Sequence, residues 1–376
     1  MKILCVSHYY PPHMGGLEIV AKNQATRLAA LGHEVAVVSS KVSDDETSGT
    51  EDGVRVVRVP ALNILEKRGV PFPFFYPSLV PTLYRETKKA DIVHIHDAFY
   101  ISSFVAAVCA KLHRKPVVLM QHIAMINHPS AVVMAVQKLV YLTTGKLIFM
   151  IADRIITLND RVEGFLAERG VPAAKLIAIP NGVDTTLFRP CAAGERMVLK
   201  EKYGLSTDKK VVVFVGRFVP KKGFQKLLAA KDSRYQIAFC GGDRPESVSA
   251  DDTEVVFLGK RTPREVAEIY RASDMFALPS EDEGFPLSVQ EAMATALPIV
   301  TSNDPGYARY QLDTKLVVLM DKPDGESLKR ELLRLAADDA LLARMSTYVH
   351  SYALEHFNWQ RVMKQLEETY SALLVR

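Results

Sequence analysis

The chain has 376 residues, about twice the length of a usual domain, so its length predicts two domains of roughly 190 residues each. Hydrophobic residues make up 48% and charged residues 24%, which is enough for two apolar cores and excludes a disordered, collagen-like or coiled-coil chain. The net charge of +4 is too small for the basic surface of a nucleic-acid-binding protein.

The cysteines and the first residues indicate a cytoplasmic protein. The four cysteines are dispersed and form no Cys-x-x-Cys pair, so the sequence predicts neither a zinc site nor a disulfide framework. Met1 and Lys2 lead directly into a short strand-like run, which leaves no room for the apolar segment of a secretory signal.

The first half of the chain alternates short β-branched runs with segments of helical period. The runs are KILCVS, EVAVVS, VRVVRV, DIVHIH, PVVLMQH, RIITLN and KLIAIP. Such alternation is typical of βαβ units around a buried parallel sheet.

A second series of such runs begins at residues 211–216 and continues with QIAFCGG, EVVFLG, DMFALPS, LPIVTS and KLVVLM. Two series predict an α/β protein with two Rossmann-like domains, residues 1–185 and 195–355. The turn-forming residues Asn181 and Gly182 open the link between them. A final helix within residues 356–376 is expected to pack back on the first domain.

Two stretches of the first half do not read as plain α/β sequence. Residues 69–84 hold four prolines and five aromatic residues without a charge, and Arg85, Lys88 and Lys89 follow them. Residues 131–151 are apolar apart from Lys138 and Lys146, and these lysines favour a helix lying in a membrane interface over one that spans the bilayer. The alternative is that both stretches are core or domain-interface material.

Gly15 and Gly16 follow the first run and precede a helix. Free N–H groups and the helix dipole favour a phosphate at such a position. The pair lacks the G-x-G-x-x-G spacing of a dinucleotide site, and the alternative is a simple helix cap.

Two cations follow the first strand of the second series. Arg217 is expected at the carboxyl end of that strand and Lys222 near the start of the next helix. Both would then overhang the crevice where open α/β sheets bind ligands. A departing diphosphate needs such fixed positive charge, and the alternative is a solvated pair.

Two carboxylates, Glu283 and Glu291, flank a Gly-Phe-Pro-Leu turn after the run DMFALPS. Glu283 is expected in the loop and Glu291 on the following helix. Carboxylates placed in this way accept hydrogen bonds from hydroxyls, Glu283 from a sugar and Glu291 from a ribose.

Taken together and in this order, the motifs resemble the retaining glycosyltransferases of family 4, over nearly the whole chain. The matching pieces are the Gly15-Gly16 loop, DIVHIHD, IPNGVD with Phe188, VGRFVPKKG, FLG, YRASDMFALPS, the Glu283-to-Glu291 element, EAMA, LPIV and FNW. The resemblance implies the GT-B fold, in which two Rossmann-like domains face each other across a cleft.

The resemblance also implies roles for individual residues. Arg217 and Lys222 match the family's diphosphate clamp, and Glu291 matches its ribose-binding acid. Gly16 matches a phosphate contact and His122 a histidine beside the donor sugar. The alternative for His122 is a capped strand end, and core positions are favoured for His94 and His96. The sugar-binding loop consists of Glu283 and the amides of Gly284, Phe285, Pro286 and Leu287.

The loop after the run LPIVTS departs from the family pattern. The sequence Asn303-Asp-Pro-Gly-Tyr replaces the usual Gly-Gly-x-x-Glu after the run LPIVTS. Donor contacts from this loop are therefore not expected to follow the family.

The expected reaction moves a sugar, a hexosyl group above all, from a nucleotide diphosphate sugar to an acceptor hydroxyl with retention at the anomeric carbon. No cofactor and no metal are expected, because the sequence has no Asp-x-Asp triplet and the cations can neutralise the diphosphate. Front-face attack is favoured over a covalent intermediate, since no carboxylate is an obvious nucleophile.

Two other classes of function remain open. A sugar phosphorylase or nucleotide-sugar epimerase would use the same two-domain fold, but a phosphorylase needs a pyridoxal-binding lysine and a much longer chain. An inactive scaffold is disfavoured by the intact set of Arg217, Lys222, Glu283 and Glu291.

The acceptor is predicted from the first half. Residues 1–190 hold 21 Lys and Arg against 16 Asp and Glu, and both unusual apolar stretches lie there. We expect a peripheral enzyme on the inner face of the cell membrane that docks on anionic lipid and glycosylates a lipid-linked or glycan intermediate of surface polysaccharide or glycolipid synthesis. The alternative is a soluble acceptor.

Overall fold

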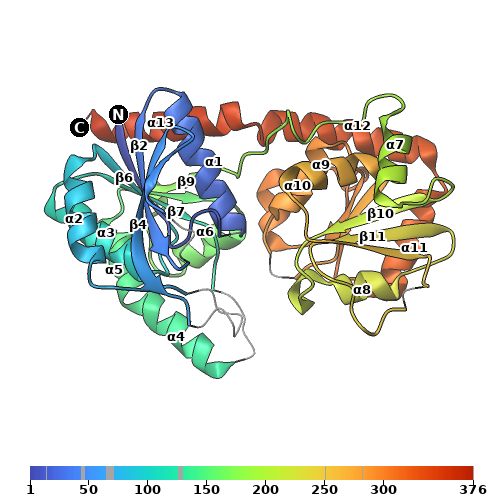
Figure 1. The fold of residues 1–376 in the computed structure, drawn as a ribbon, viewed down its shortest axis with the longest axis horizontal. Coiled ribbons are helices and arrows are strands. Elements are labelled where there is room, and N and C mark those ends of the chain that lie inside the picture. Colours follow the sequence, from blue (N-terminus) through green and yellow to red (C-terminus); the bar gives the residue numbers. More distant parts are fainter. Residues whose placement is uncertain are drawn as a thin grey trace. The chain divides into compact units, whose positions relative to one another are not determined.

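The computed structural model describes residues 1–13, 15–43, 47–64, 72–125, 130–249, 251–281 and 283–375. They form two compact α/β units; in Figure 1 the first is blue to green with the red C-terminal helix, and the second runs from yellow-green to red. The first unit comprises Met1–Asn181 and Gln360–Arg376, and the second comprises Gly182–Trp359. Residues 69–71 of the predicted aromatic stretch lie outside the described residues.

The first unit is built on a nine-stranded sheet of order β3-β4-β2-β1-β6-β7-β8-β9, with β5 paired to β4. All pairings are parallel except those of β3 and β5 with β4. The central strands β6 and β7 are buried at every position and mostly apolar, as expected for a sheet covered on both faces. The strand bounds are β1 Lys2–Val6, β2 Glu34–Lys41, β3 Gly49–Glu51, β4 Val54–Leu62, β5 Phe74–Phe75, β6 Ile92–His96, β7 Val117–Gln121, β8 Arg154–Thr157 and β9 Leu176–Ala178.

The helices of the first unit are α1 Gly16–Ala30, α2 Leu79–Lys89, α3 Ile101–Leu112, α4 Ala131–Leu142, α5 Thr144–Ile151, α6 Asp160–Ala167 and the short 3₁₀ turn Ala173–Lys175. Helix α2 packs beside α3, α3 beside α5, and α5 beside α4. The final helix, α13 Trp359–Leu374, returns to this unit, where Tyr370 hydrogen-bonds His94 at 2.6 Å and Glu367 contacts His33 at 2.7 Å.

The second unit holds a six-stranded parallel sheet of order β12-β11-β10-β13-β14-β15. The bounds are β10 Lys210–Val215, β11 Tyr235–Cys240, β12 Val255–Gly259, β13 Met275–Leu278, β14 Ile299–Ser302 and β15 Val318–Met320. In chain order this is 3-2-1-4-5-6, the Rossmann arrangement, and its order reverses between β10 and β13. A ligand is therefore expected at the carboxyl ends of these two strands.

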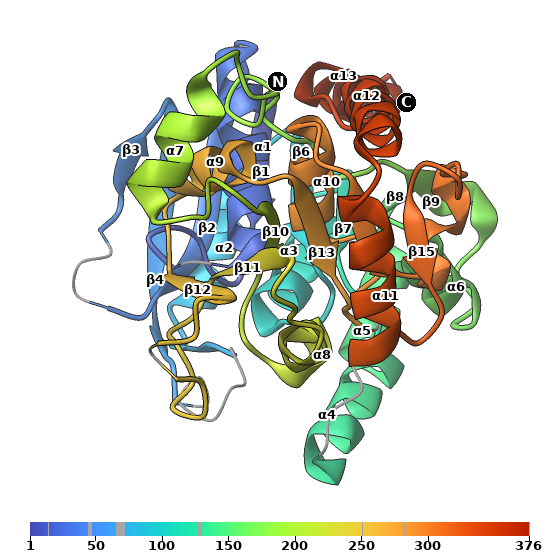
Figure 2. The same ribbon diagram turned by 90° about the vertical axis from the view of Figure 1, so that its right-hand side faces the viewer.

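Helices cover both faces of this sheet. They are α7 Glu195–Tyr203, α8 Phe224–Ala229, α9 Pro263–Ala272, α10 Leu287–Ala294, α11 Gly325–Ala336 and α12 Asp339–His356, with 3₁₀ turns at Pro220–Lys222 and Pro305–Tyr310. Figure 2 shows α9 and α10 above the strands and α8 below them. A capping box between Thr262 and Glu265 starts α9 and satisfies two of its free N–H groups.

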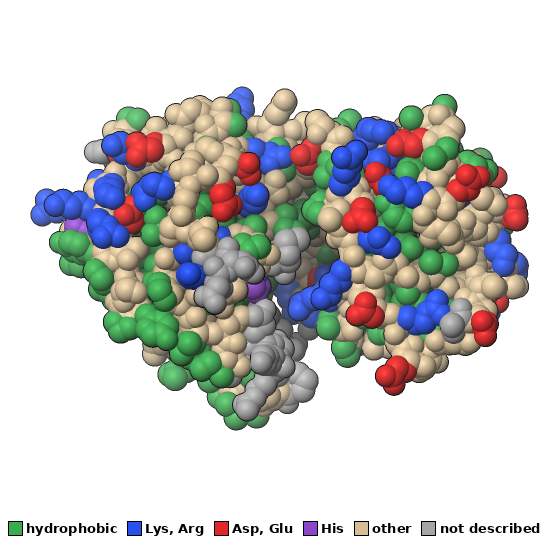
Figure 3. All heavy atoms as spheres, in the orientation of Figure 1, with side chains coloured by type: hydrophobic (Ala, Val, Ile, Leu, Met, Phe, Trp, Pro, Cys, Tyr) green, Lys and Arg blue, Asp and Glu red, His purple; other side chains and the backbone are tan. Residues whose placement is uncertain are grey.

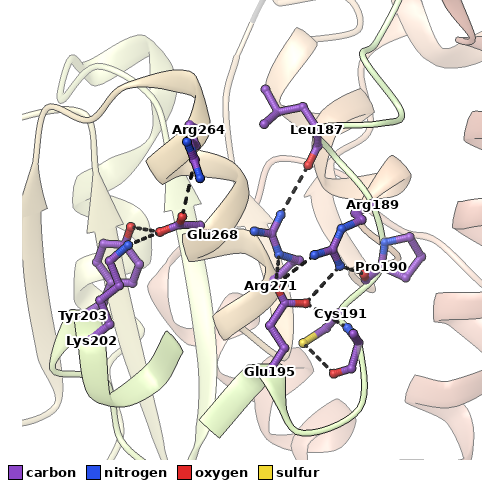
Figure 4. A network of polar contacts seen from close by, with 11 residues as sticks. Leu187, Arg189, Pro190, Cys191, Glu195, Lys202, Tyr203, Arg264, Glu268 and Arg271 are labelled. Carbon is purple, nitrogen blue, oxygen red and sulfur yellow. Dashed lines mark hydrogen bonds and ion pairs between the residues drawn. The ribbon is translucent and has the colours of Figure 1, made fainter. Parts of the chain in front are cut away.

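The segment that opens the second unit is fastened to α9 by a partly exposed group of ion pairs (Figure 4). Glu195 accepts two hydrogen bonds from Arg189, at 2.9 and 3.0 Å, and one from Arg271 at 2.9 Å. The pKa of Glu195 is held at about 2, mainly by the hydrogen bonds from Arg189. A second group joins Glu268 to Tyr203 at 2.6 Å.

Candidate functional site

The loops that follow β10 and β13 meet at the carboxyl edge of the second sheet. Gly223 has φ +71°, and a Cβ atom there would lie 2.1 Å from the carbonyl oxygen of Pro279. Glycine is thus required for this approach. The N–H of Glu281 donates to the carbonyl of Lys221 at 2.8 Å, so the two loops are joined backbone to backbone where the strand order reverses.

Lys222 and Glu283 are brought into contact by this junction. The ammonium of Lys222 donates a close, charged hydrogen bond to the Glu283 carboxylate, and the Lys221 ammonium lies 3.6 Å from the same group. The Lys222 and Glu283 side chains are 17% and 14% exposed, so the pair is shielded but reachable. Two residues predicted as a phosphate ligand and a sugar ligand are therefore neighbours.

Arg217 directly follows Gly216 at the end of β10 and is exposed. Within the described part of the chain, no ion pair holds its guanidinium. The loop after β11 packs against the backbone of Gly216, the residue before Arg217, because a Cβ at Gly241 would lie 2.3 Å from the Gly216 carbonyl oxygen. The position of Arg217 is thus fixed through its backbone while its charge faces solvent.

Glu291 lies in the second turn of α10 and is half-buried. Burial raises the pKa of its carboxyl to about 8, and the Tyr270 hydroxyl acts in the opposite direction. Tyr270 is itself buried and donates to the Ser288 carbonyl at 3.1 Å. Hydroxyl donors of a ligand would favour the ionised form of this carboxyl and lower its pKa.

The turn that precedes α10 is anchored by Phe285, which is buried between aromatic rings. Its ring lies 4.3 Å from Tyr310, 4.7 Å from Tyr307 and 5.2 Å from Phe357, measured between centroids. Gly284 has φ +73°, and a Cβ at Gly306 would lie 2.4 Å from the Gly284 Cα. The buried Phe285 side chain therefore fixes the conformation of the loop.

The loop after β14 packs against this turn through the contact of Gly306 with Gly284. Asp304 is buried and its carboxylate accepts from the N–H of Gly306 at 2.8 Å. Asp304 thus caps its own short 3₁₀ turn. The sequence Asn303-Asp-Pro-Gly-Tyr, which departs from the family pattern, therefore holds Gly306 against Gly284.

In the first unit, α1 begins at Gly16 directly after the Gly15 N-cap. Glu18, in the first turn, is buried and contacts His13 at 3.1 Å. A Cβ at Gly15 would lie 2.3 Å from the Glu18 carboxylate, whereas a Cβ at Gly16 meets nothing within 4 Å. The N-terminus of α1 therefore already faces a carboxylate of its own first turn.

His122 follows β7 and hydrogen-bonds His96 at 3.0 Å between ring nitrogens. Burial lowers the pKa of His122 to about 3 and that of His96 well below its usual range, so both imidazoles are neutral at pH 7. His8, after β1, is buried and stacks on Tyr100 with centroids 3.5 Å apart. The carboxyl ends of β1, β6 and β7 thus gather uncharged histidines.

Asp97 was singled out by no sequence argument beyond its place in DIVHIHD, yet it lies at the same edge. It is fully buried with φ +68°, and its carboxylate accepts from the Phe99 N–H at 3.1 Å and from Gln121 at 3.2 Å. Burial raises its pKa to about 6. The only sequence signal for it is its position directly after the buried strand β6, which an acid seldom follows without a role at that edge of the sheet.

Two family descriptions match the chain and together span most of it. Residues 14–187 match "Glycosyltransferase Family 4", and residues 195–351 match "Glycosyl transferases group 1". The chain belongs to the family 4 glycosyltransferases. The protein is thus an enzyme that transfers a sugar from a nucleotide-sugar donor, which confirms the predicted family and the coarse activity.

Relatives of known sequence agree with this membership. A D-inositol 3-phosphate glycosyltransferase of Corynebacterium urealyticum is 27% identical, and the alignment covers 96% of this chain and 91% of that protein. An uncharacterized glycosyltransferase of Methanocaldococcus jannaschii is 25% identical over 100% of this chain and 99% of its own.

Solved structures confirm the predicted two-domain GT-B fold. A sucrose-phosphate synthase from Thermosynechococcus elongatus matches with a TM-score of 0.76 at 21% identity, covering 100% of this chain and 99% of that one. HepE of Anabaena, in complex with UDP-glucose, matches with a TM-score of 0.77 at 18% identity, covering 99% and 100%.

In this glycosyltransferase the predicted site residues fall into two groups. Gly15, Gly16 and His122 belong to the first unit, where His122 hydrogen-bonds His96. In the second unit Lys222 contacts Glu283 directly. The other predicted residues of that unit line the adjoining loops and α10: Arg217, Gly284, Phe285, Pro286, Leu287 and Glu291.

Proposed function

We propose that the protein is a retaining, metal-independent hexosyltransferase that acts on a nucleotide diphosphate sugar and a lipid-linked or glycan acceptor. The observation that carries the proposal is the contact of Lys222 with Glu283 at the point where the strand order of the second sheet reverses. Lys222, the proposed ligand of the diphosphate, and Glu283, the proposed acceptor for the sugar hydroxyls, are then close enough to bind one nucleotide sugar together. No cofactor enters the proposed reaction.

In the proposed step the bond between the anomeric carbon and the diphosphate oxygen breaks, and a bond from the acceptor oxygen to the same face of that carbon forms. The acceptor's proton passes to the departing phosphate oxygen, so that a nucleoside diphosphate leaves. Arg217 and Lys222 stabilise the charge that develops on it. Glu283 and the backbone groups of Gly284 to Leu287 orient the sugar.

His122 is proposed to lie beside the donor sugar as an uncharged hydrogen-bonding group. Burial holds its pKa at about 3, so it neither repels the developing positive charge of the sugar nor binds the diphosphate as a cation. Its hydrogen bond with His96 fixes the direction of the ring. Gly16 is proposed as a backbone contact to the donor phosphate.

The experiment that tests this function is a panel of nucleotide sugars incubated with the protein, with release of nucleoside diphosphate as the readout. NMR of the glycosylated product then gives the anomeric configuration. We expect one preferred donor and the same configuration in donor and product. Inversion at the anomeric carbon, or interconversion of the sugar without transfer, would replace the proposal by another reaction.

Metal independence gives a separate prediction. Transfer is expected to persist in excess EDTA, because two lysines and Arg217 stand where a divalent cation would otherwise neutralise the diphosphate. Initial rates with and without chelator measure this. Activity that is lost in EDTA and returns only with Mg²⁺ or Mn²⁺ would show that the cations do not suffice.

Glu291 predicts a pH dependence of nucleotide binding. Ribose hydroxyls donate to the ionised carboxylate, whereas the free protein holds this group with a pKa of about 8. Binding therefore releases a proton, and affinity is expected to rise as pH increases from 6 to 8, by up to ~tenfold per pH unit, and to level off above.

The matched control for this pH profile is Glu291→Gln, whose amide does not titrate. The nucleotide's own phosphate titrates equally in both proteins, so the difference between their calorimetric profiles isolates Glu291. Parallel profiles for the wild type and Glu291→Gln would contradict the assignment of the ribose to this residue.

The acceptor is proposed to be lipid-linked, with the enzyme peripheral on the cytoplasmic face of an anionic membrane. Support comes from exposed apolar residues of the first unit, among them Val132, Leu139 and Leu142. A soluble polyol phosphate is the second candidate, because several relatives are named D-inositol 3-phosphate glycosyltransferases. Transfer to inositol phosphate in the absence of lipid would favour this second acceptor.

A further inference from the structure

The outward face of the two-helix element α4–α5 is apolar. Six large hydrophobic residues on it are between 46% and 72% exposed: Val132, Val136, Leu139, Leu142, Leu147 and Met150. Their spacing of three to five residues places them on one side of the helices. In Figure 3 hydrophobic side chains run along the lower left rim of the first unit.

The inward face of the same element is fixed in the core. Tyr141, Ile148 and Phe149 are buried, and the Tyr141 ring meets Phe165 edge to face with centroids 4.9 Å apart. Helix α5 packs beside α3. The outward residues therefore cannot turn inward without dismantling this packing, and their exposure is a property of the folded unit.

Charge identifies what covers the face. From Ala98 to Ala152 the chain holds five cations, Lys111, Arg114, Lys115, Lys138 and Lys146, and no acidic residue. Lys138 and Lys146 are exposed on α4–α5 itself. A second copy of this chain would bring like charges together around the apolar face, whereas anionic headgroups would neutralise them.

Neither α4 nor α5 is long enough by itself to cross a bilayer. By length and composition residues 131–151 would suffice for a span. However, the helix is interrupted at Thr143, where φ is −114° and ψ is −95°. Helix α4 has 12 residues and α5 has 8, so they extend only ~18 and ~12 Å, against a hydrocarbon core of ~30 Å.

We infer that the outward face of α4–α5 is the surface by which the protein docks on an anionic lipid bilayer. The six apolar side chains enter the boundary between headgroups and acyl chains, and Lys138 and Lys146 reach the lipid phosphates. This inference rests on the proposed peripheral membrane location and names the surface responsible for it. In the aromatic stretch Phe72 packs on Phe99 and Tyr100, whereas Phe74, Tyr76, Val80 and Tyr84 are 43–53% exposed, so that stretch stays available as a second contact with the lipid.

The test is flotation of the full-length protein with vesicles of phosphatidylcholine containing phosphatidylglycerol, compared with phosphatidylcholine alone. We expect the wild type to float with the anionic vesicles at low salt. Leu139→Gln combined with Leu142→Gln, and separately Lys138→Glu combined with Lys146→Glu, should lower the bound fraction tenfold or more.

The matched controls change equally exposed residues of the second unit. Met197→Gln with Val198→Ser matches the apolar pair, since these residues are 51% and 64% exposed, and Lys260→Glu with Lys315→Glu matches the charge pair. Both controls should float like the wild type. Every variant should retain nucleotide binding in solution, which separates loss of docking from failure of the glycosyltransferase proposal.

Three outcomes would overturn the inference. The first is a wild type that does not bind anionic vesicles, and the second is that both α4–α5 variants bind them as well as the wild type does. In the third, sedimentation would show a wild-type dimer that both variants convert to monomer while vesicle binding is absent, and the face would then belong to a second copy.

Discussion

Replacement of Lys222 by alanine is expected to lower kcat/KM for the nucleotide sugar by ~10²-fold or more. The Lys222 ammonium lies at the reversal point of the second sheet, beside Glu283. Loss of one contact that stabilises charge developing on the leaving diphosphate costs ~3 kcal/mol in the transition state. Arg217→Ala is expected to lose as much, and initial rates with the preferred donor measure both.

Lys226 provides the matched control for this clamp. It lies one turn into α8, and its ammonium pairs with Glu281 at 2.5 Å rather than with Glu283. Lys226→Ala should therefore keep near wild-type kcat/KM while removing the same charge from nearly the same place. Near-normal turnover in both Lys222→Ala and Arg217→Ala, with thermal unfolding unchanged, would remove the clamp from the mechanism.

Most of the fold could be predicted because its strands are buried on both faces. A parallel strand covered by helices is a short continuous apolar run, and DMFALPS and QIAFC became β13 and β11 for that reason. The antiparallel strands β3 and β5 were not predicted. Gly49–Glu51 is exposed along its length, and Phe74–Phe75 spans two residues, so neither has a hydrophobic pattern to detect.

The site could be predicted as residue types but not as contacts. The sequence placed Lys222 after one strand and Glu283 after another, and open α/β sheets bring such loops to one edge. Their direct contact depends on Gly223 approaching Pro279, which is 56 positions further along the chain. Local sequence carries no sign of such an approach, because a glycine after two lysines also fits an ordinary helix start.

Hydrophobic character alone does not tell which residues are buried. Phe285 is 5% exposed, whereas Leu142 of the apolar stretch 131–151 is 71% exposed. Helical periodicity identifies a face without saying what covers it. His94 and His96 are both buried, but His94 hydrogen-bonds Tyr370 of α13 while His96 contacts His122, so only His96 lies beside a predicted site residue.

Glu283→Gln is expected to change binding and turnover in opposite directions. In the free protein the Lys222 ammonium is held by the Glu283 carboxylate, so an incoming diphosphate must displace that carboxylate. Removing its charge should raise the affinity for the released nucleoside diphosphate about fivefold, the ~1 kcal/mol of a partly exposed ion pair. Transfer should nevertheless fall ~10²-fold, because the sugar hydroxyls lose their charged acceptor.

Calorimetry of the nucleoside diphosphate and steady-state rates with its sugar measure the two effects. Glu281→Gln is the control, since Glu281 pairs with Lys226 and should leave both quantities unchanged. If Glu283 instead served only to orient Lys222, Glu283→Gln would weaken nucleotide binding as Lys222→Ala does. If the Glu283 carboxylate and the diphosphate compete for the Lys222 ammonium, Glu283→Gln must instead strengthen nucleotide binding. Donor binding then frees Glu283 to accept hydrogen bonds from the sugar that arrives with the diphosphate.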